Sequence, residues 1–304
     1  MINGIVNVYK EKGFTSFDVV AKMRGIFHQK KIGHTGTLDP DAEGVLPVCL
    51  GKATRVCDLL TDKDKEYEAV LLLGQETDTQ DISGEVLNQA EVTCSLEEVR
   101  EVILSFVGDY MQVPPMYSAL KVNGQKLCDL ARKGVTVERQ ARPVKIFDIE
   151  ILDISLPEVR MKVHCSKGTY IRTLCQDIGT KLGCFGCMKS LLRTRVSEFT
   201  LDNAYRLSEL EELVKKAGET GDHYFVQSVD KVFLHYPAIS VKEEARKMIV
   251  NGNRIPVSFV IEEEYPETVR LYDSKKEFVG LYAYKQAEND FKPIKIFMDN
   301  NEIH

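Results

Sequence analysis

The chain has 304 residues, 43% of them hydrophobic, and a formal net charge of −6 at pH 7. This length can bury a substantial core and predicts one large domain or two. No apolar run approaches the ~20 residues that a membrane-spanning helix needs, and the N-terminus has no secretory signal pattern. We therefore expect a cytoplasmic protein without membrane attachment. Eight irregularly spaced cysteines fit a reducing compartment, where disulfides are not expected.

The first third of the sequence predicts a strand, a helix, a loop and a second strand. Residues 4–10 are strand-like, and residues 15–27 place apolar side chains at helical spacing after a Thr-Ser N-cap. The loop that follows, "GHTGTLDPDAEGVLPVCLGKATR" at 33–55, ends in a buried-looking strand. Residues 67–74, "YEAVLLLG", are nearly all apolar, which predicts a strand in a sheet covered on both faces.

Three helices are predicted further along the chain. A Ser95–Glu98 capping box begins one, which we expect to end at Gly108. The half-buried strand 159–165 leads into another, with Tyr170 and Arg172 in its first turn. A cation there opposes the helix dipole, which indicates that an anion lies nearby. A third acidic helix should be capped by Ser208 with Glu211.

The C-terminal part predicts a small β-rich unit. A boundary is expected between residues 218 and 235. Beyond it, a capped helix over 240–252 precedes three short strand candidates, "TVRLYD", "FVGLYAY" and "IKIFMD".

The charge is unevenly distributed along the chain. Residues 112–146 carry seven cations and two carboxylates, and residues 160–199 carry eight cations and two carboxylates. The segment 114–143 begins with a Pro-Pro turn and contains an Asn-Gly pair, so it predicts a basic excursion from the core. Such a polarised chain can present a basic face to nucleic acid, although solvated surface charge explains the same composition.

Several ligand sites are conceivable from the sequence, and most fail on spacing. Asp39, Asp41, Glu43 and Gly44 resemble the start of a calcium loop, but Leu50 stands where the bidentate Glu belongs. The glycines at 44 and 51 are too far apart for a Walker phosphate loop. Cys184 and Cys187 form one CxxC without a second ligand pair, which disfavours zinc. What remains is a turn that displays Asp39, or an ordinary Asp-Pro turn.

Four blocks together carry a family resemblance. They are the loop at 33–55 and the segments "YEAVLLLGQETDTQDISGEV", "PPMYSALKVNGQKLCDLARKG" and "VHCSKGTYIRTLCQDIG". In this order they resemble the tRNA pseudouridine synthase B family, which isomerises uridine at position 55 in the T loop of tRNA. The likeness covers most of residues 1–200. The tail from residue 236 looks more loosely like a PUA-type RNA-binding domain.

The resemblance implies roles for individual residues. Asp39 corresponds to the essential catalytic aspartate, with Tyr67 and Arg172 beside it in the site. His34 is expected to hold the disrupted T loop. The uridine pocket and its surroundings are expected to include three further residues, Tyr170, Leu191 and Lys167. Leu191 is the best match to the pocket leucine of the family, and the adjacent Leu192 is the alternative.

The chemistry of the isomerisation suits these residue types. The N-glycosidic bond breaks, the uracil rotates, and a carbon–carbon bond forms, so no metal or organic cofactor is expected. A carboxylate can attack the ribose, abstract a ribose proton or add to the base, and the sequence leaves these routes open. Arg172 should keep Asp39 ionised, and Tyr67 can stack on uracil and accept the C5 proton directly or through water.

The resemblance implies an α+β fold: a catalytic domain over residues 1–232, with a mixed, largely antiparallel sheet flanked by helices, and a PUA-like β domain over 236–304. The basic segments should grip tRNA and compensate for flipping the uridine out of its stack. We expect a monomer with no obligatory protein partner. The alternatives are a non-catalytic tRNA-binding or folding module on the same scaffold, and a synthase for another uridine position.

Overall fold

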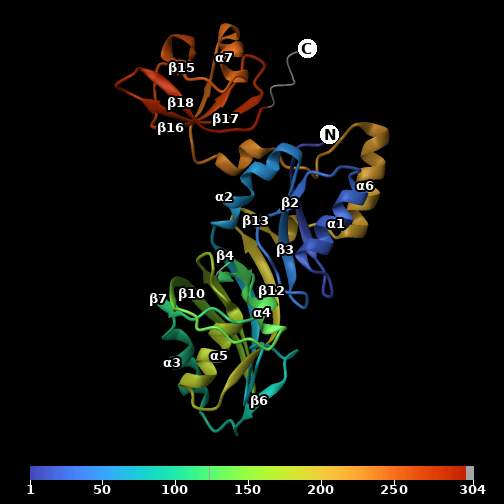
Figure 1. Ribbon diagram of the computed structural model, residues 1–304, viewed down its shortest axis with the longest axis vertical. Helices are drawn as coiled ribbons and strands as arrows, with labels where there is room; N and C mark the ends of the chain where they lie inside the picture. Colours follow the sequence, from blue (N-terminus) through green and yellow to red (C-terminus); the bar gives the residue numbers. More distant parts are fainter. Residues whose placement is uncertain (123, 299–304) are drawn as a thin grey trace.

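The computed structural model describes residues 1–122 and 124–298, which form an elongated molecule with a large sheet below and a small one above (Figure 1). Within these residues the large sheet has nine strands, ordered β1-β3-β12-β4-β11-β10-β7, with β2 paired to β3 and β13 to β12. Among the described strands of this large sheet, only the β3–β12 pair is parallel. The strands are β1 Gly4–Lys10, β2 Ile32–His34, β3 Glu43–Leu50, β4 Lys65–Leu73, β7 Gly108–Gln112, β10 Arg142–Ser155, β11 Glu158–Cys165, β12 Gly186–Val196 and β13 Phe199–Thr200. The predicted mixed, largely antiparallel sheet is confirmed.

Helices cover the sheet in two separate places. α1 (Ser16–Ile26) and α6 (Leu207–Thr220) pack on β1 and β3 around a core that includes Val8, Met23 and Leu46. α3 (Leu96–Leu104) and α5 (Ile171–Lys181) pack on β4, β10 and β11 around a second core. The catalytic candidates lie where these two halves of the sheet meet.

A third core joins the large sheet to the C-terminal unit. It lies on the other face of β1 and β3 and combines the 3-10 helix η1 (Gly51–Val56), α2 (Cys57–Thr61) and the 3-10 helix η3 (Val229–Phe233) with C-terminal residues such as Leu281 and Phe297. The small sheet is ordered β14-β16-β17-β18-β15. Its elements are β14 Ala238–Ser240, η4 Glu243–Ala245, α7 Arg246–Val250, β15 Ile255–Pro256, η5 Val257–Phe259, β16 Thr268–Tyr272, β17 Phe278–Lys285 and β18 Asp290–Ile296.

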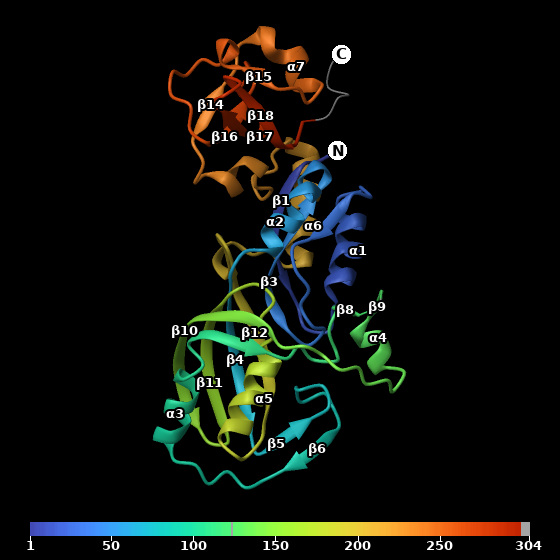
Figure 2. The same cartoon turned by 60° about the vertical axis from the view of Figure 1, so that its left-hand side comes forward.

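The basic segment 114–143 leaves the sheet as an excursion, as predicted (Figure 2). It carries the short hairpin β8 (Lys121–Val122) and β9 (Gln125–Lys126), followed by α4 (Leu127–Ala131). A second hairpin, β5 (Gln75–Thr77) and β6 (Val86–Gln89), extends from the end of β4. The short η2 (Leu201–Asn203) links β13 to α6. No helix of residues 1–122 and 124–298 is long and apolar enough to cross a membrane.

The predicted N-terminal caps of two helices are confirmed, but other helix ends differ. Thr15 caps α1, and Ser95 with Glu98 caps α3. α3 ends at Leu104 rather than Gly108, because Gly108 adopts φ 112° at the start of β7. α6 begins after Arg206, whose backbone N–H donates to Glu209 at 2.6 Å, so the predicted Ser208–Glu211 cap is wrong.

The C-terminal strands were predicted with one shift in position. The third strand spans Asp290–Ile296 rather than 294–299, because Phe297 leaves the strand to pack in the junction core. Residue 299 of that prediction, and residues 299–304 of the predicted domain, lie outside the described part. The predicted helix over 240–252 is only η4 followed by α7. β4 alternates between buried and half-buried residues, so helices cover only one of its faces.

Candidate active site

Asp39 lies in the loop between β2 and β3, which is anchored on both sides. Buried Leu38 donates its backbone N–H to Ser16 Oγ at 2.9 Å, and the Ala42 N–H donates to the Asp39 carbonyl at 3.1 Å. Gly36 and Gly44 have φ of 145° and 105°, a region that glycine adopts without a steric penalty. The loop thereby holds the Asp39 side chain at the surface of the site, 39% exposed.

Arg172 reaches Asp39 from the first turn of α5. Its Nε lies 2.9 Å from Asp39 Oδ2, and its Nη2 donates to Asp39 Oδ1 at 3.2 Å, which makes a two-point pair. The guanidinium is 5% exposed and also donates to the carbonyls of Thr79 at 3.0 Å and Tyr117 at 2.8 Å. The anion predicted near this first-turn cation is therefore Asp39. One guanidinium joins the Asp39 loop, the 78–84 loop and the start of the basic excursion.

Burial and the nearby cations act in opposite directions on the pKa of Asp39. Burial raises the pKa of the Asp39 carboxyl above its usual range, and the nearby Asp81 raises it further. Arg172 and Lys10 lower this pKa but do not cancel the effect of burial. Arg172 thus favours the ionised carboxylate, as expected, while the net direction of the pKa is upward.

Tyr67 lies on β4, directly across from Arg193 on β12. It is 9% exposed and packs with Leu38 and Ala42 of the catalytic loop. Burial raises the pKa of Tyr67 to about 12, against a smaller lowering by Arg193. Tyr67 is therefore a neutral phenol near pH 7.

Leu191 and Tyr170, the two residues expected at the uridine pocket, both lie on elements that border the Asp39 site. Leu191 pairs with Ala69 across β4 and packs on the core that contains Tyr67, whereas Leu192 pairs with Glu68 on the opposite face. Tyr170 caps α5, and its backbone N–H donates to Gln112 Oε1 at 2.8 Å.

His34 ends β2 and accepts the Gly36 N–H at Nδ1 over 3.3 Å; burial lowers its pKa. Lys167 is separate, because it is exposed and pairs with Asp62 at 2.8 Å.

Three charged residues that support the site were not predicted. Arg193 is 1% exposed, and its Nε donates to the Val45 carbonyl at 2.7 Å. Asp81 lies 4.0 Å from Arg172 Nε. Lys10 is fully buried and donates to the Pro40 carbonyl at 3.0 Å; burial lowers its pKa to about 8. A cation at the end of the mostly apolar strand 4–10 was an available signal for Lys10, but Arg193 lies among other polar residues of β12 and gave no such signal.

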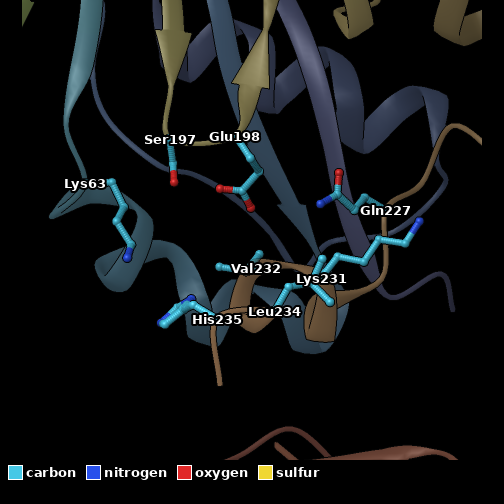
Figure 3. Close-up of a pocket in the computed structure, with 8 residues that line it drawn as sticks. All are labelled: Lys63, Ser197, Glu198, Gln227, Lys231, Val232, Leu234 and His235. Carbon is cyan, nitrogen blue, oxygen red and sulfur yellow. The ribbon is translucent and has the colours of Figure 1, made fainter. Parts of the chain in front are cut away.

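A hollow of about 450 Å³ lies away from Asp39, at the junction with the C-terminal unit (Figure 3). Its lining includes Lys63, Glu198 and His235 but none of the predicted catalytic residues. Cys184 and Cys187 are both buried and unbridged. Among the described residues, no group of three or more His, Cys, Asp or Glu side chains is arranged to hold a metal ion.

The fold is that of the pseudouridine synthases. A chain in a solved H/ACA RNP bound to a substrate RNA containing 2′-deoxyuridine is similar in structure, with a TM-score of 0.71 and 26% sequence identity. The match covers 98% of this chain and 86% of that chain. A chain in a solved Cbf5-Nop10-Gar1 complex has a TM-score of 0.72 and 28% sequence identity, and the match again covers 98% of this chain and 86% of that chain.

Sequence comparison narrows this class to one family. Residues 24–171 match the N-terminal domain of the TruB family of pseudouridylate synthases, and residues 172–234 match the tRNA pseudouridylate synthase B C-terminal domain. A tRNA pseudouridine synthase B from Lachnoclostridium phytofermentans is 55% identical over 98% of this chain and all of its own length. One from Alkaliphilus oremlandii is 47% identical over 97% of each chain. The chain belongs to the TruB family, and it is an isomerase that converts uridine to pseudouridine in tRNA.

Proposed function

We propose that this enzyme isomerises uridine 55 in the T loop of tRNA, with Asp39 as the catalytic carboxylate. The observation that carries the proposal is the two-point ion pair between Asp39 and Arg172. Buried Arg172 fixes the direction of the carboxylate, while Asp39 itself stays accessible to a substrate. A fixed, partly desolvated carboxylate is suited to nucleophilic work.

The proposed reaction balances without a cofactor. The bond between ribose C1′ and uracil N1 breaks, the uracil turns, and a bond forms between C1′ and C5. The C5 proton leaves, and N1 gains one. Because Tyr67 is neutral near pH 7, we assign it to packing against the uracil, with the C5 proton leaving through water.

The remaining candidates are proposed for binding the RNA. Leu191 and Tyr170 would contact the flipped nucleotide, and His34 would hold the vacated part of the T loop. Lys167 and the excursion 114–143 would contact phosphates farther away, which predicts binding that weakens steeply with salt. We propose residues 1–232 as the catalytic domain and residues 236–304 as a PUA-like RNA-binding domain. The enzyme would act as a monomer in the cytoplasm, where its substrate is found.

Release of tritium from uracil C5 tests this proposal. We expect wild type to release tritium from tRNA transcripts labelled at that carbon, and Asp39→Asn to release essentially none while it still binds the RNA. A transcript with cytidine at position 55 is the matched substrate control and should retain its label. Equal release by Asp39→Asn and wild type would contradict the catalytic role. RNA binding without release by wild type would identify a non-catalytic binding module.

A further inference from the structure

α1 presents an aromatic side chain and several cations to solvent. Phe17, in its first turn, is 65% exposed, although the helix buries Val19, Val20 and Met23 on its other side. The Arg24 guanidinium lies over the Phe17 ring at 6.0 Å from its centroid, and Lys22 Nζ lies 5.9 Å from the centroid of Phe14. Figure 2 shows α1 on the outside of the sheet. A single exposed Phe is ordinary, but one surrounded by cations indicates a specific surface.

The charge of this surface is strongly positive. Residues 11–31 hold five exposed cations, which together with Phe14 and Phe17 we call the α1 face: Lys12, Lys22, Arg24, Lys30 and Lys31. Both carboxylates of the segment already have partners. Glu11 pairs with Arg206 at 2.7 Å, and Asp18 accepts the Thr15 N–H at 2.8 Å in the helix cap. The cations are therefore available to an anionic ligand on a protein that is acidic overall.

The α1 face is joined directly to the catalytic loop. Ser16, which precedes Phe17, accepts the Leu38 N–H at 2.9 Å, and Leu38 precedes Asp39. The Gly13 N–H donates to the Pro40 carbonyl at 2.9 Å on the other side of Asp39. Hydrogen bonds on both sides of Asp39 therefore tie its loop to the segment that carries Phe17.

We propose that the α1 face binds the RNA strand next to the flipped uridine, with a base stacked on Phe17 and phosphates against Lys22 and Arg24. This inference rests on the proposed function and adds a positioning surface to it. Exposed aromatic rings among cations bind unpaired RNA because every base offers a face for stacking and every linkage offers a negative charge. Charge complementarity favours RNA over a second copy of this acidic chain.

Tryptophan fluorescence tests the stacking directly. The chain contains no tryptophan, so Phe17→Trp introduces a single reporter. We expect its emission to be quenched in a saturable way by a T stem-loop RNA. Tyr224→Trp is the matched control, because Tyr224 is similarly exposed, at 67%, and lies outside the proposed surface. Equal responses of the two reporters, or a silent Phe17→Trp at saturating RNA, would overturn the inference.

Binding and kinetics give a second measurement. Phe17→Ala should raise the Kd for the stem-loop roughly tenfold, and should raise KM much more than it changes kcat, because stacking on a neighbouring base aids positioning. Tyr224→Ala should leave both unchanged. Lys22→Ala should reduce the slope of log K against log salt by about 0.7, the contribution of one phosphate contact to an unpaired strand. Unchanged affinity in Phe17→Ala contradicts the proposal.

The two proposals can fail separately. If wild type releases tritium but Phe17→Trp is silent, only the α1 face is wrong. If wild type binds the RNA without tritium release and the reporter responds, the isomerisation of uridine 55 is wrong and the RNA surface stands. Quenching that depends on protein concentration in the absence of RNA would assign the α1 face to self-association and overturn the inference.

Discussion

The acid–base behaviour of Asp39 depends on charges that can be removed one at a time. The proposed mechanism uses the ionised carboxylate of Asp39, so activity should fall as pH drops through the pKa of Asp39, which burial holds above its usual range. Asp81→Asn removes a like charge and lowers that pKa, so the acid limb of the kcat/KM profile should move to lower pH. Lys10→Met removes an opposite charge and should move the limb to higher pH.

Asp41→Asn is the matched control for these profiles. Asp41 is an exposed carboxylate two residues from Asp39, and it is not among the main influences on the Asp39 pKa. We expect the acid limb of the kcat/KM profile of Asp41→Asn to coincide with that of wild type. A shift in Asp41→Asn as large as that in Asp81→Asn would show that the electrostatics of the loop are assigned wrongly.

Asp39 and Arg172 were both named from the sequence as candidate site residues, but the charged residues that support this pair were not predicted. The position of Arg172 in the first turn of a helix indicated a nearby anion, but the turn pattern alone left Asp39 open between a displayed carboxylate and an ordinary Asp-Pro turn. The family resemblance implied the site roles of both residues. Lys10 ends a mostly apolar strand, whereas Arg193 lies in β12 together with Lys189 and Arg195 and does not stand out from its neighbours. The carbonyl partners of Arg193 and Lys10, at Val45 and Pro40, are set by the pairing of β12 with β3 and by the loop conformation, which no local pattern encodes.

The position of α5 relative to β12 determines where Arg172 lies. A Cβ added at Gly179 would lie 2.2 Å from both the Gly186 nitrogen and the Phe185 carbonyl carbon, so the helix packs backbone to backbone there. Gly179→Ala should push α5 away and destabilise the protein by about 1–3 kcal/mol. Because Arg172 lies on the same helix, the activity of the folded variant should fall as well.

Gly218→Ala provides the matched control in α6. Gly218 is also inside a helix, and nothing lies within 4 Å of the Cβ it would gain. This substitution should raise the free energy of unfolding by about 0.5–1 kcal/mol, since alanine loses less backbone entropy than glycine on folding. Urea denaturation measures both variants. Equal effects at the two glycines would contradict the close contact between α5 and β12.

At the scale of elements, local signals predicted where helices begin better than where they end. The predicted capping box of Ser95 with Glu98 depends only on residues three apart and is confirmed, and of the two N-cap candidates Thr15 and Ser16 the structure has Thr15. The start of α6 was placed two residues late, because Arg206 rather than Ser208 is the cap residue. β18 ends early because Phe297 packs outside its own sheet. Elements whose ends are fixed by distant packing cannot be bounded from their own residues.

At the scale of the whole molecule, the two sheets are joined by a shared apolar core. The charge and turn pattern of the sequence did not predict this contact. The predicted boundary between residues 232 and 236 falls at the end of η3, where Val232 and Phe233 are both buried. The Phe233 ring lies 6.2 Å from that of Phe278 and 5.8 Å from that of Phe297. Phe278 and Phe297 stack on each other at 5.5 Å. Linker residues thus form part of a core that both sheets share.

Phe233→Ala tests whether this junction carries stability. Removing a buried ring that contacts both sheets should cost about 3–5 kcal/mol of unfolding free energy. Leu234→Ala is the matched control. The Leu234 side chain is next in the sequence and 63% exposed, so its removal should leave the free energy of unfolding nearly unchanged. We also expect Phe233→Ala to be cleaved faster by limited proteolysis within residues 222–235, because the lost contacts hold this segment in place. If Phe233→Ala unfolds at the same urea concentration as Leu234→Ala, the junction contributes little, and the C-terminal sheet is held by other contacts such as the hydrogen bond from Arg55 Nη1 to the Ile296 carbonyl.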